Sequence, residues 1–404
     1  MRIGFDATPL LMAPRFGIHQ HAYEVVRHLA RLHPEDRYVL FFDRDLSGRP
    51  SFDRAALAEL GPAVEPVPLR TFGPTMRIAQ AAWWRWHLPR AIARHGIDVF
   101  HGLAHLIPFT RRRPLVLTVH DLMPVEFLSW TPGDRAAVRA RRQVLSAIRR
   151  ATAIAAVSEA TRRDVLGTGY VRPGAPIAVT PNAAREVFQR VTDAARLAAV
   201  KERYGLPDAF LLTVGADTPR RNYARLLRAF AEARQLDAAV GPLVIVGNTD
   251  WPQTRAHRLA GELGVRDRVI FCRGVGDEDL AAVYTLATAY VCPSLHEGFG
   301  MPVVEALACG TPVACSDVPA LREVAGEDAD YFDPADVGAI ARALRSPPTR
   351  GATEGPAAGT GRFSWERAAE AAHGLYHELC ARRHARAAAP RSPRDPAALA
   401  PNLD

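Results

Sequence analysis

The stretch AYVCPSLHEGFGMPVVEALACGTPVACS (289–316) has the pattern of one βαβ unit, and it decides the fold. Residues 289–294 form an apolar run of strand length, and residues 311–316 form another. Between them, Pro302 suits the first turn of a helix, where its missing N–H costs nothing, and Gly310 suits the end of that helix. The loop before Pro302 therefore follows the carboxyl end of a parallel strand, where open α/β sheets bind ligands.

Apolar runs of strand length recur along the chain in two series, separated by helical patterns. The runs are 2–7, 38–42, 98–102, 115–121, 153–158 and 177–182 in the first series, and 210–216, 242–248, 268–274, 289–294 and 311–316 in the second. Continuous apolar runs are typical of parallel sheets that are covered on both faces. We therefore predict an α/β fold with two doubly wound, Rossmann-like domains that face a cleft.

These series divide the chain into four parts. We predict an N-terminal domain over 1–184, a C-terminal domain over 185–362, a helix over 363–385 and a disordered tail over 386–404. Ser364 is suited to cap the start of the helix. The tail is rich in proline and alanine and lacks the apolar residues that a packed core needs.

The charge, the cysteines and the apolar runs of the chain argue against several classes of protein. The 404 residues carry a net charge of +8, almost all of it from arginine, since Lys201 is the only lysine. The five cysteines are scattered and form no CxxC pair, so we expect neither a disulfide framework nor a structural zinc, and a cytoplasmic location fits best. No apolar run is long enough to cross a bilayer, and the first residues have the pattern of a strand, not of a signal peptide.

The positive net charge suggests two kinds of anionic partner, nucleic acid and membrane lipid. No zinc-finger spacing and no basic region linked to heptads is present, so we expect no nucleic acid partner. The arginine-rich helix expected over 135–151 is of a kind that can lie on anionic membranes. A solvated helix is the favoured interpretation, with weak contact to the inner membrane surface as the alternative.

Two glutamates flank the glycine-rich loop of the central βαβ unit. The loop consists of Gly298, Phe299, Gly300 and Met301 and leads into the start of the expected helix. Backbone N–H groups at such a position have no partner within the helix and can bind phosphate. Glu297 precedes the loop and Glu305 lies in the first turns of the helix, whose dipole favours an anion there. An ionised carboxylate accepts two hydroxyls, as a ribose diol presents them.

The motif EGFGMPVVE (297–305) resembles the E-x7-E motif of glycosyltransferase family 4. The members of this family are retaining enzymes of the GT-B fold that use nucleotide sugars. The surrounding residues 292–334 are similar to the family from end to end. The resemblance covers roughly residues 1–380, and three further family stretches stand in the expected order: VSEATRRDV (157–165), TPNAA (180–184) and FSWERAAE (363–370).

The resemblance implies a role for each glutamate. Glu297 is expected to hold a hydroxyl of the donor sugar, and Glu305 to bind the ribose of the nucleotide. The amides of residues 298–301 would face the sugar and the diphosphate. The two carboxylates would then clamp the two ends of one donor, unlike the acid/base pair of ordinary glycosidases.

The stretch VGADTPRRNYARLLRAF (214–230) resembles the phosphate-binding part of the family's donor site. Arg220 and Arg221 would neutralise the departing diphosphate, although the family usually has lysine where Arg221 stands. Ala216 stands where the family often has a second basic residue, which puts part of the phosphate site in doubt. The donor-binding set also includes Gly17, Gly215, Asn222, Gly247, Gly274 and Val275.

Two stretches of the first domain resemble the opposite wall of the family's site. In TVHDLMP (118–124), His120 is expected near the reacting sugar, and Asp121 either faces the acceptor or caps its own loop. In MAPRFGIHQHAYEV (12–25), Gly17 and Ile18 match the family's glycine loop, whereas His19 replaces its second glycine. Ile18 and His19 are therefore assigned to the acceptor side.

The resemblance implies a retaining hexosyltransferase in which His120, Glu297, Arg220 and Arg221 form the catalytic set. The donor would be of the GDP-mannose, UDP-glucose or UDP-N-acetylglucosamine type, and the acceptor a hydroxyl of a sugar, a lipid-linked sugar or a small molecule. No cofactor and no metal are expected, because arginines and helix N-termini replace a cation at the diphosphate. Two alternatives stay open: another GT-B enzyme, such as an epimerase or a phosphorylase, and a sugar-nucleotide-binding subunit without catalysis.

Overall fold

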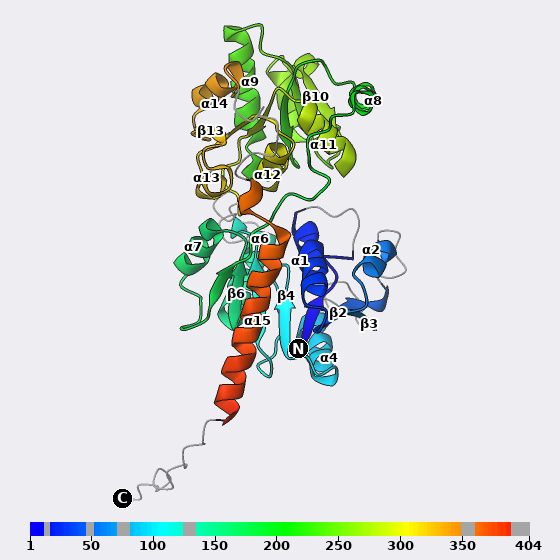
Figure 1. The fold of residues 1–404 in the computed structure, drawn as a ribbon. Coiled ribbons are helices and arrows are strands. Elements are labelled where there is room, and N and C mark those ends of the chain that lie inside the picture. Colours follow the sequence, from blue (N-terminus) through cyan, green and yellow to red (C-terminus); the bar gives the residue numbers. More distant parts are fainter. Residues whose placement is uncertain (12–16, 46–51, 71–80, 124–134, 349–359, 389–404) are drawn as a thin grey trace, which may run out of the picture.

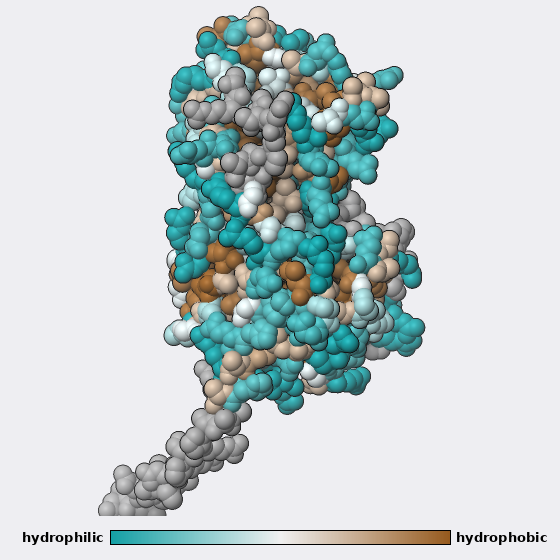
Figure 2. All heavy atoms as spheres, in the orientation of Figure 1, coloured by the Kyte–Doolittle hydropathy of each residue, from teal (hydrophilic) through white to brown (hydrophobic). Residues whose placement is uncertain are grey.

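The computed structural model describes residues 1–11, 17–45, 52–70, 81–123, 135–348 and 360–388. Figure 1 shows two α/β domains, one above the other, with the long C-terminal helix running along the lower, N-terminal one. Hydrophilic residues cover most of the same face in Figure 2. No helix in the described ranges has both the length and the apolar character that a bilayer span needs.

The first domain is built on a parallel sheet of seven strands in the order β3-β2-β1-β4-β5-β6-β7. Its central strand pairs place Ile3 opposite both Tyr38 and Val99, and all three side chains are buried. The strands are β1 (Arg2–Asp6), β2 (Arg37–Asp43), β3 (Val64–Leu69), β4 (Val99–Gly102), β5 (Leu115–Val119), β6 (Ala153–Ala156) and β7 (Ile177–Val179).

Helices cover both faces of this sheet, as its continuous apolar strands require. Helix α1 buries Val25, Val26 and Leu29 on the side turned to the sheet. Helix α7 begins at Ser158, whose Oγ accepts a hydrogen bond of 2.9 Å from the N–H of Thr161. The helices are α1 (Ile18–Leu32), α2 (Arg54–Glu59), the π-helical turn η2 (Trp83–His87), α4 (Leu88–Arg94), α6 (Arg135–Arg150) and α7 (Glu159–Gly167).

The second domain has a parallel sheet of six strands in the order β10-β9-β8-β11-β12-β13. The strands are β8 (Leu211–Val214), β9 (Leu243–Val246), β10 (Val269–Cys272), β11 (Ala289–Cys292), β12 (Val313–Ser316) and β13 (Ala329–Phe332). The helices are α8 (Ala194–Tyr204), η4 (Pro219–Arg221), α9 (Tyr223–Leu236), η5 (Trp251–Gln253), α10 (Arg255–Glu262), η6 (Arg266–Arg268), α11 (Asp277–Leu286), α12 (Met301–Ala308), α13 (Pro319–Ala325) and α14 (Val337–Arg345). The predicted pair of doubly wound domains is therefore confirmed.

The chain returns to the first domain through η7 (Thr360–Arg362) and α15 (Trp365–Ala388). Ser364 caps α15 as predicted, since its Oγ accepts a hydrogen bond of 3.2 Å from the N–H of Arg367. Helix α15 packs against α1 and buries Trp365, Ala368, Ala369, Ala372, Leu375, Tyr376 and Leu379 in the core of the first domain. It extends three residues into the predicted tail, because its helical turns continue to Ala388; residues 389–404 lie outside the described ranges.

Two strands, β3 and β13, were not predicted. Both lie at the edge of their sheets, where a strand is covered less completely. Strand β3 contains Pro66 and Pro68, which are tolerated at an edge because one side of the strand has no partner. Strand β13 is half-exposed and therefore lacks the apolar run by which the central strands were found.

Candidate active site

The central βαβ unit has the predicted form. Strands β11 and β12 pair in parallel, with Tyr290 opposite Val313. Gly300 adopts a φ of 107° at the start of α12, and Pro302 occupies its first turn. Gly310, with a φ of 73°, follows the end of the helix. The glycine-rich loop thus lies at the carboxyl edge of the second sheet, beside the first domain.

Glu297 lies buried between two arginines. Its Oε1 is 2.6 Å from Arg221 Nη1 and accepts a hydrogen bond of 2.8 Å from Ser294 Oγ, while its Oε2 pairs with Arg220 Nη1. Burial alone would raise the pKa of this carboxyl, but Arg221 and Arg220 outweigh it and the pKa is lowered. Glu297 is therefore an ionised carboxylate at neutral pH.

The cluster carries more positive than negative charge. Glu297 is one carboxylate between two guanidinium groups, and the Nε of Arg220 is buried with no hydrogen-bond partner among the described residues. Such a group has spare capacity for an anion, because buried donors are normally hydrogen-bonded. Sequence reasoning assigned Arg220 and Arg221 to a phosphate and Glu297 to a sugar; the structure brings all three together and pairs them with one another.

The turn that carries the arginines is fixed by Asn222. This residue adopts a left-handed conformation with a φ of 58°, which asparagine tolerates better than most residues. Its Nδ2 donates hydrogen bonds to the carbonyl oxygens of Pro293, at 2.9 Å, and of Pro334, at 2.8 Å. Asn222 thus ties η4 to the end of β11 and fixes the turn on which Arg220 and Arg221 lie.

Two predicted glycines allow close packing behind the loop: Gly215 makes room for Arg221, and Gly247 makes room for the backbone of Gly215. A Cβ on Gly215 would lie 2.8 Å from Arg221 Nε, and a Cβ on Gly247 would lie 2.4 Å from the carbonyl oxygen of Gly215. Burial acts to lower the pKa of Arg221, but Glu297 reverses this and the pKa is raised. Arg221 is therefore a permanent, largely buried cation behind the loop.

Glu305 lies in a less charged environment than Glu297. Burial raises its pKa to about 7, although the charge of Arg185 acts in the opposite direction. Its Oε2 accepts a hydrogen bond of 3.1 Å from the hydroxyl of Tyr284. Arg185 itself forms a two-pronged ion pair with Asp277, at 2.5 and 2.7 Å. The helix dipole led us to expect a simple anion, whereas burial leaves comparable amounts of acid and carboxylate near neutral pH.

A cavity of about 560 Å³ lies between the domains, next to this part of the site. Gly274 and Val275, both predicted to bind the donor, are part of its wall. The wall also includes Gln20, Tyr23, Glu24, Arg27 and Asp53 of the first domain and Arg185, Glu186, Val187, Asn248, Gly276 and Asp277. Sequence reasoning missed the residues of α1; their signal is the polar face of the helix that follows the predicted glycine loop.

His120 forms part of the first-domain wall as a buried, neutral imidazole. Its Nε2 donates a hydrogen bond of 2.8 Å to the carbonyl oxygen of Leu103, and the ring of His21 stands edge-on to it at 4.7 Å. Burial, together with the charges of His21 and His105, lowers the pKa of His120 well below its usual value. His120 therefore offers a lone pair on Nδ1 and carries no charge.

The loop between the two glutamates also joins the domains. A Cβ on Gly298 would lie 1.7 Å from the carbonyl oxygen of His120, so the contact requires glycine. The carbonyl oxygen of Gly298 accepts hydrogen bonds from Ser158 Oγ, at 2.5 Å, and from Thr161 Oγ1, at 3.0 Å. We expected Gly298 to allow close approach of a ligand; in this structure the close approach is to the first domain.

The remaining predicted residues have varied surroundings. Asp121 Oδ1 accepts a hydrogen bond of 3.1 Å from the N–H of Met123, which fits the loop-capping interpretation. The side chain of Phe299 is buried edge-on against Phe363, so only its backbone is available to a ligand, and Met301 packs against the cores of both domains. Gly17, Ile18 and His19 open α1, and residues 12–16 of the same loop lie outside the described ranges.

Two family models match the chain, one in each domain. The model described as Glycosyltransferase Family 4 matches residues 17–185, and the model described as Glycosyl transferases group 1 matches residues 199–347. The serotype-specific mannosyltransferase WbdA of Escherichia coli is 32% identical over 235 residues, which are 57% of this chain and 28% of that protein. The O-antigen chain mannosyltransferase B of Escherichia coli is 33% identical over 245 residues, 60% of this chain and 63% of that protein.

The chain thus spans less than two thirds of the length of both relatives. Among solved structures, a sucrose-phosphate synthase from Thermosynechococcus elongatus has the same fold, with a TM-score of 0.68 at 20% identity over 96% of this chain and all of that one. The order of motifs, the two sheets and the two family models agree, and the chain belongs to the family 4 type of glycosyltransferases with the GT-B fold.

Proposed function

We propose that the protein transfers a hexosyl unit from a nucleoside diphosphate sugar to a hydroxyl acceptor, with retention of configuration and without a metal ion. The observation that carries the proposal is the cluster of Arg220, Arg221 and Glu297 at the carboxyl edge of the second sheet. Its surplus positive charge, beside the first turn of α12, is suited to a diphosphate.

The two guanidinium groups would stabilise the departing diphosphate. Charge that develops on a leaving group is best neutralised by donors that are already fixed in place, and both arginines are held by Glu297 and largely buried. A diphosphate that binds them competes with Glu297 for the same N–H groups. The carboxylate of Glu297 then has oxygen atoms free to accept hydroxyls of the donor sugar.

The electrostatics also support same-face transfer without a covalent enzyme intermediate. Ion pairing with Arg220 and Arg221 withdraws charge from Glu297, so this carboxylate is a weak nucleophile. His120 is neutral and donates through Nε2 to Leu103, which leaves Nδ1 as an acceptor. In the proposed reaction the acceptor oxygen attacks the anomeric carbon on the face that the diphosphate leaves, and a leaving phosphate oxygen takes the acceptor's proton.

The nucleotide would extend from the arginine cluster toward the cavity between the domains. Gly274 and Val275 on its wall offer backbone groups to the base, and the ionised form of Glu305 is suited to the ribose hydroxyls. The relatives named above are mannosyltransferases, so GDP-mannose is the first donor to test, followed by UDP-glucose and UDP-N-acetylglucosamine. The acceptor hydroxyl would belong to a sugar, a lipid-linked sugar or a small molecule.

A transfer assay tests this function directly. The full chain is incubated with each donor and a panel of mannose- and glucose-terminated acceptors, and product is detected by mass spectrometry, with its anomeric configuration read by NMR. We expect product with retained configuration, in excess chelator as well as without it. Inverted product would refute retention, and loss of product in chelator with rescue by manganese would refute metal independence. Donor turnover without an acceptor would favour an epimerase or phosphorylase, and binding without turnover a non-catalytic subunit.

A further inference from the structure

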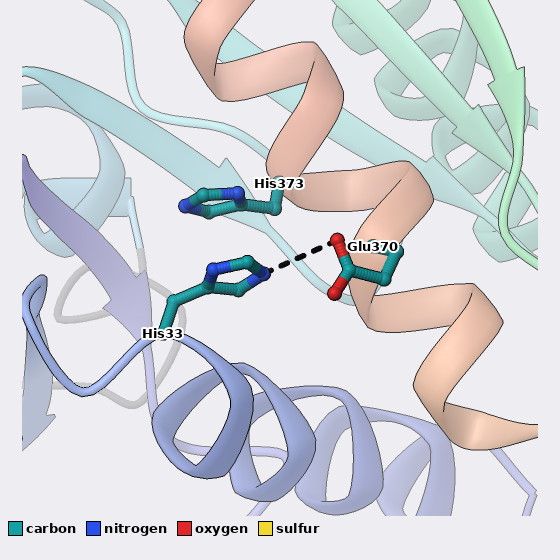
Figure 3. Close-up of side chains that lie close together, drawn as sticks. All are labelled: His33, Glu370 and His373. Atoms are coloured by element: carbon teal, nitrogen blue, oxygen red, sulfur yellow. Dashed lines mark ion pairs between the residues drawn. The ribbon is translucent and has the colours of Figure 1, made fainter.

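A group of histidine and carboxylate side chains joins the C-terminal end of α1 to α15 in the first domain. His33 directly follows α1, and Glu370 and His373 lie on α15. Figure 3 shows the three side chains converging from the two helices. Helix α1 has 15 residues and a rise of about 1.5 Å per residue, so His33 lies roughly 22 Å from the end of α1 that reaches the glycine loop.

The ligand atoms of these three side chains are close enough to share one cation. Each residue offers one such atom, and all of them lie within 4.8 Å of one another. His33 Nε2 is 3.3 Å from Glu370 Oε2. A tetrahedral ion with bonds of about 2.0–2.1 Å holds its ligand atoms about 3.3–3.4 Å apart, so this pair already has the spacing that zinc requires.

The Nε2 atom of His33 is otherwise unexplained. It is buried and has no hydrogen-bond partner within the described part of the chain, since the nearby Glu370 oxygen lies beyond good hydrogen-bond geometry. Buried polar atoms are normally satisfied by the protein, by water or by an ion. The orphaned nitrogen is therefore an independent sign that a ligand completes this group.

His373 is oriented as metal-binding histidines commonly are. Its Nε2 is 2.8 Å from Asp36 Oδ2, to which it donates, and this leaves the Nδ1 lone pair available. A carboxylate on the far nitrogen of a metal-binding histidine fixes the tautomer and strengthens the imidazole as a ligand. His377 follows on α15 with its ring 4.5 Å from that of His373, and the spacing of Glu370, His373 and His377 places them on one helical face.

The rings of His33 and His373 lie flat on each other, with centroids 3.4 Å apart and 10° between their planes. The lone pair of an imidazole nitrogen lies in the plane of its ring. One of the two rings must therefore turn about its Cβ–Cγ bond for both to face the same ion. His33 is the ring that would turn, because its Nε2 has no hydrogen bond among the described residues and its Nδ1 lies 3.5 Å from the exposed carboxylate of Glu35.

We propose that His33, Glu370 and His373 bind one divalent transition-metal ion of the zinc class, with Asp36 orienting His373. Two neutral imidazoles and one carboxylate supply three ligands, and water completes the tetrahedron. The ion ties the end of α1 to the helix that returns from the second domain. Its role is structural, so it is separate from the proposed transfer reaction.

The test uses the full chain, freed of metal with chelator and then titrated with Co²⁺ and, separately, with Zn²⁺. We expect one Co²⁺ per chain with the intense visible absorption of tetrahedral coordination, and one Zn²⁺ by calorimetry. His33→Ala, His373→Ala and Glu370→Gln should each lower the affinity at least tenfold. His95→Ala is the matched control, because His95 lies 3.8 Å from the carboxylate of Glu65 but belongs to no cluster of possible metal ligands among the described residues; this variant should bind metal as the wild type does.

Three results would overturn the proposal: a weak, octahedral Co²⁺ spectrum, unchanged affinity in His33→Ala, or an equal loss in His95→Ala. Zn²⁺ should also raise the melting temperature of the wild type but not that of His33→Ala. In chelator His33→Ala should melt at or below the wild type, because it loses the stacking on His373, so the readout is the rise that Zn²⁺ produces within each protein. If His33→Ala fails to fold, the half-exposed Glu370→Gln gives the same comparison, and wild-type affinity in that variant would refute the site.

Discussion

Glu297→Gln separates the two functions that we assign to the arginine cluster. In the free protein the Glu297 carboxylate is the common partner of Arg220 and Arg221, which the proposed reaction requires for the diphosphate. Glutamine keeps the size of the side chain but removes the negative charge. The substitution therefore leaves two largely buried guanidinium groups without their ionised partner, and the net charge of the cluster rises from +1 to +2.

This change should have opposite effects on binding and on turnover. Removal of one partner from a buried ion pair costs about 3–5 kcal/mol, so the free variant should melt at a lower temperature. A diphosphate no longer has to displace the carboxylate. The hydrogen bond to a charged group that no longer has to be broken is worth about 1.5–3 kcal/mol, and each 1.4 kcal/mol of binding free energy changes the dissociation constant tenfold. Nucleoside diphosphate should therefore bind at least about tenfold more tightly. Sugar transfer should fall at least tenfold, because the acceptor of the donor's hydroxyls is lost.

The assay measures the affinity for GDP and UDP by calorimetric titration, and the initial rate of sugar transfer, for the wild type, Glu297→Gln and Glu305→Gln. Glu305 is assigned to the ribose, so its variant should bind nucleoside diphosphate more weakly. Equal weakening by both substitutions would show that Glu297 contacts the nucleotide directly and does not compete with it. Unchanged nucleotide affinity in Glu297→Gln would show that the arginines do not hold the diphosphate, and unchanged transfer would show that Glu297 does not hold the sugar.

The geometry of the site makes four further predictions. Arg221→Ala should lower the rate of transfer at least a hundredfold, whereas Arg221→Lys should keep much of it because the charge remains; equal loss in both would mean that the two-pronged geometry of arginine is essential. Gly298→Ala should lower the melting temperature and the rate together, since its Cβ would overlap the carbonyl oxygen of His120, and a wild-type melting curve would show that this contact does not form in solution. Nucleoside diphosphate should bind more tightly as the pH rises through about 7, where Glu305 ionises, and Glu305→Gln should abolish this dependence. The pKa of Glu305 is about 7 in the folded protein and near 4.5 in the unfolded chain, so between these pH values only the folded protein holds the proton. The stability contributed by protonated Glu305 should therefore decline between about pH 4.5 and 7 and be lost above pH 7. A denaturation series in which the stability of the wild type relative to Glu305→Gln rises with pH over this range would contradict the burial argument.

The sequence was sufficient for the parts of the fold that are repetitive and buried. Central strands such as β8 and β11 are continuous apolar runs, and they were predicted because burial on both faces leaves no room for polar residues. The edge strands β3 and β13 follow a different rule, since each is half-exposed, and no apolar run marks them. Caps such as Ser364 were predictable because their chemistry is local.

Sequence motifs named candidate residues for the site but could not show the contacts among them. Arg220, Arg221 and Glu297 were identified separately, each from a motif, but their mutual pairing depends on how the turn held by Asn222 meets the end of β11. The pKa of Glu305 depends on the depth at which α12 is packed, which no local pattern encodes. Contacts between segments that lie far apart in the sequence require the tertiary structure.

The position of Gly298 has a consequence for how ligand binding and domain motion depend on each other. The same four-residue loop supplies amides to the proposed donor site and a carbonyl oxygen to Ser158 and Thr161 of the other domain. Coupling between donor binding and domain contact is reciprocal. If donor binding favours the contact between the domains by some factor, then the donor binds more tightly, by the same factor, when the domains are in contact. The affinity for nucleotide sugar is thus a property of both domains, and substitutions at Ser158, which contacts the loop from the other domain, should alter it.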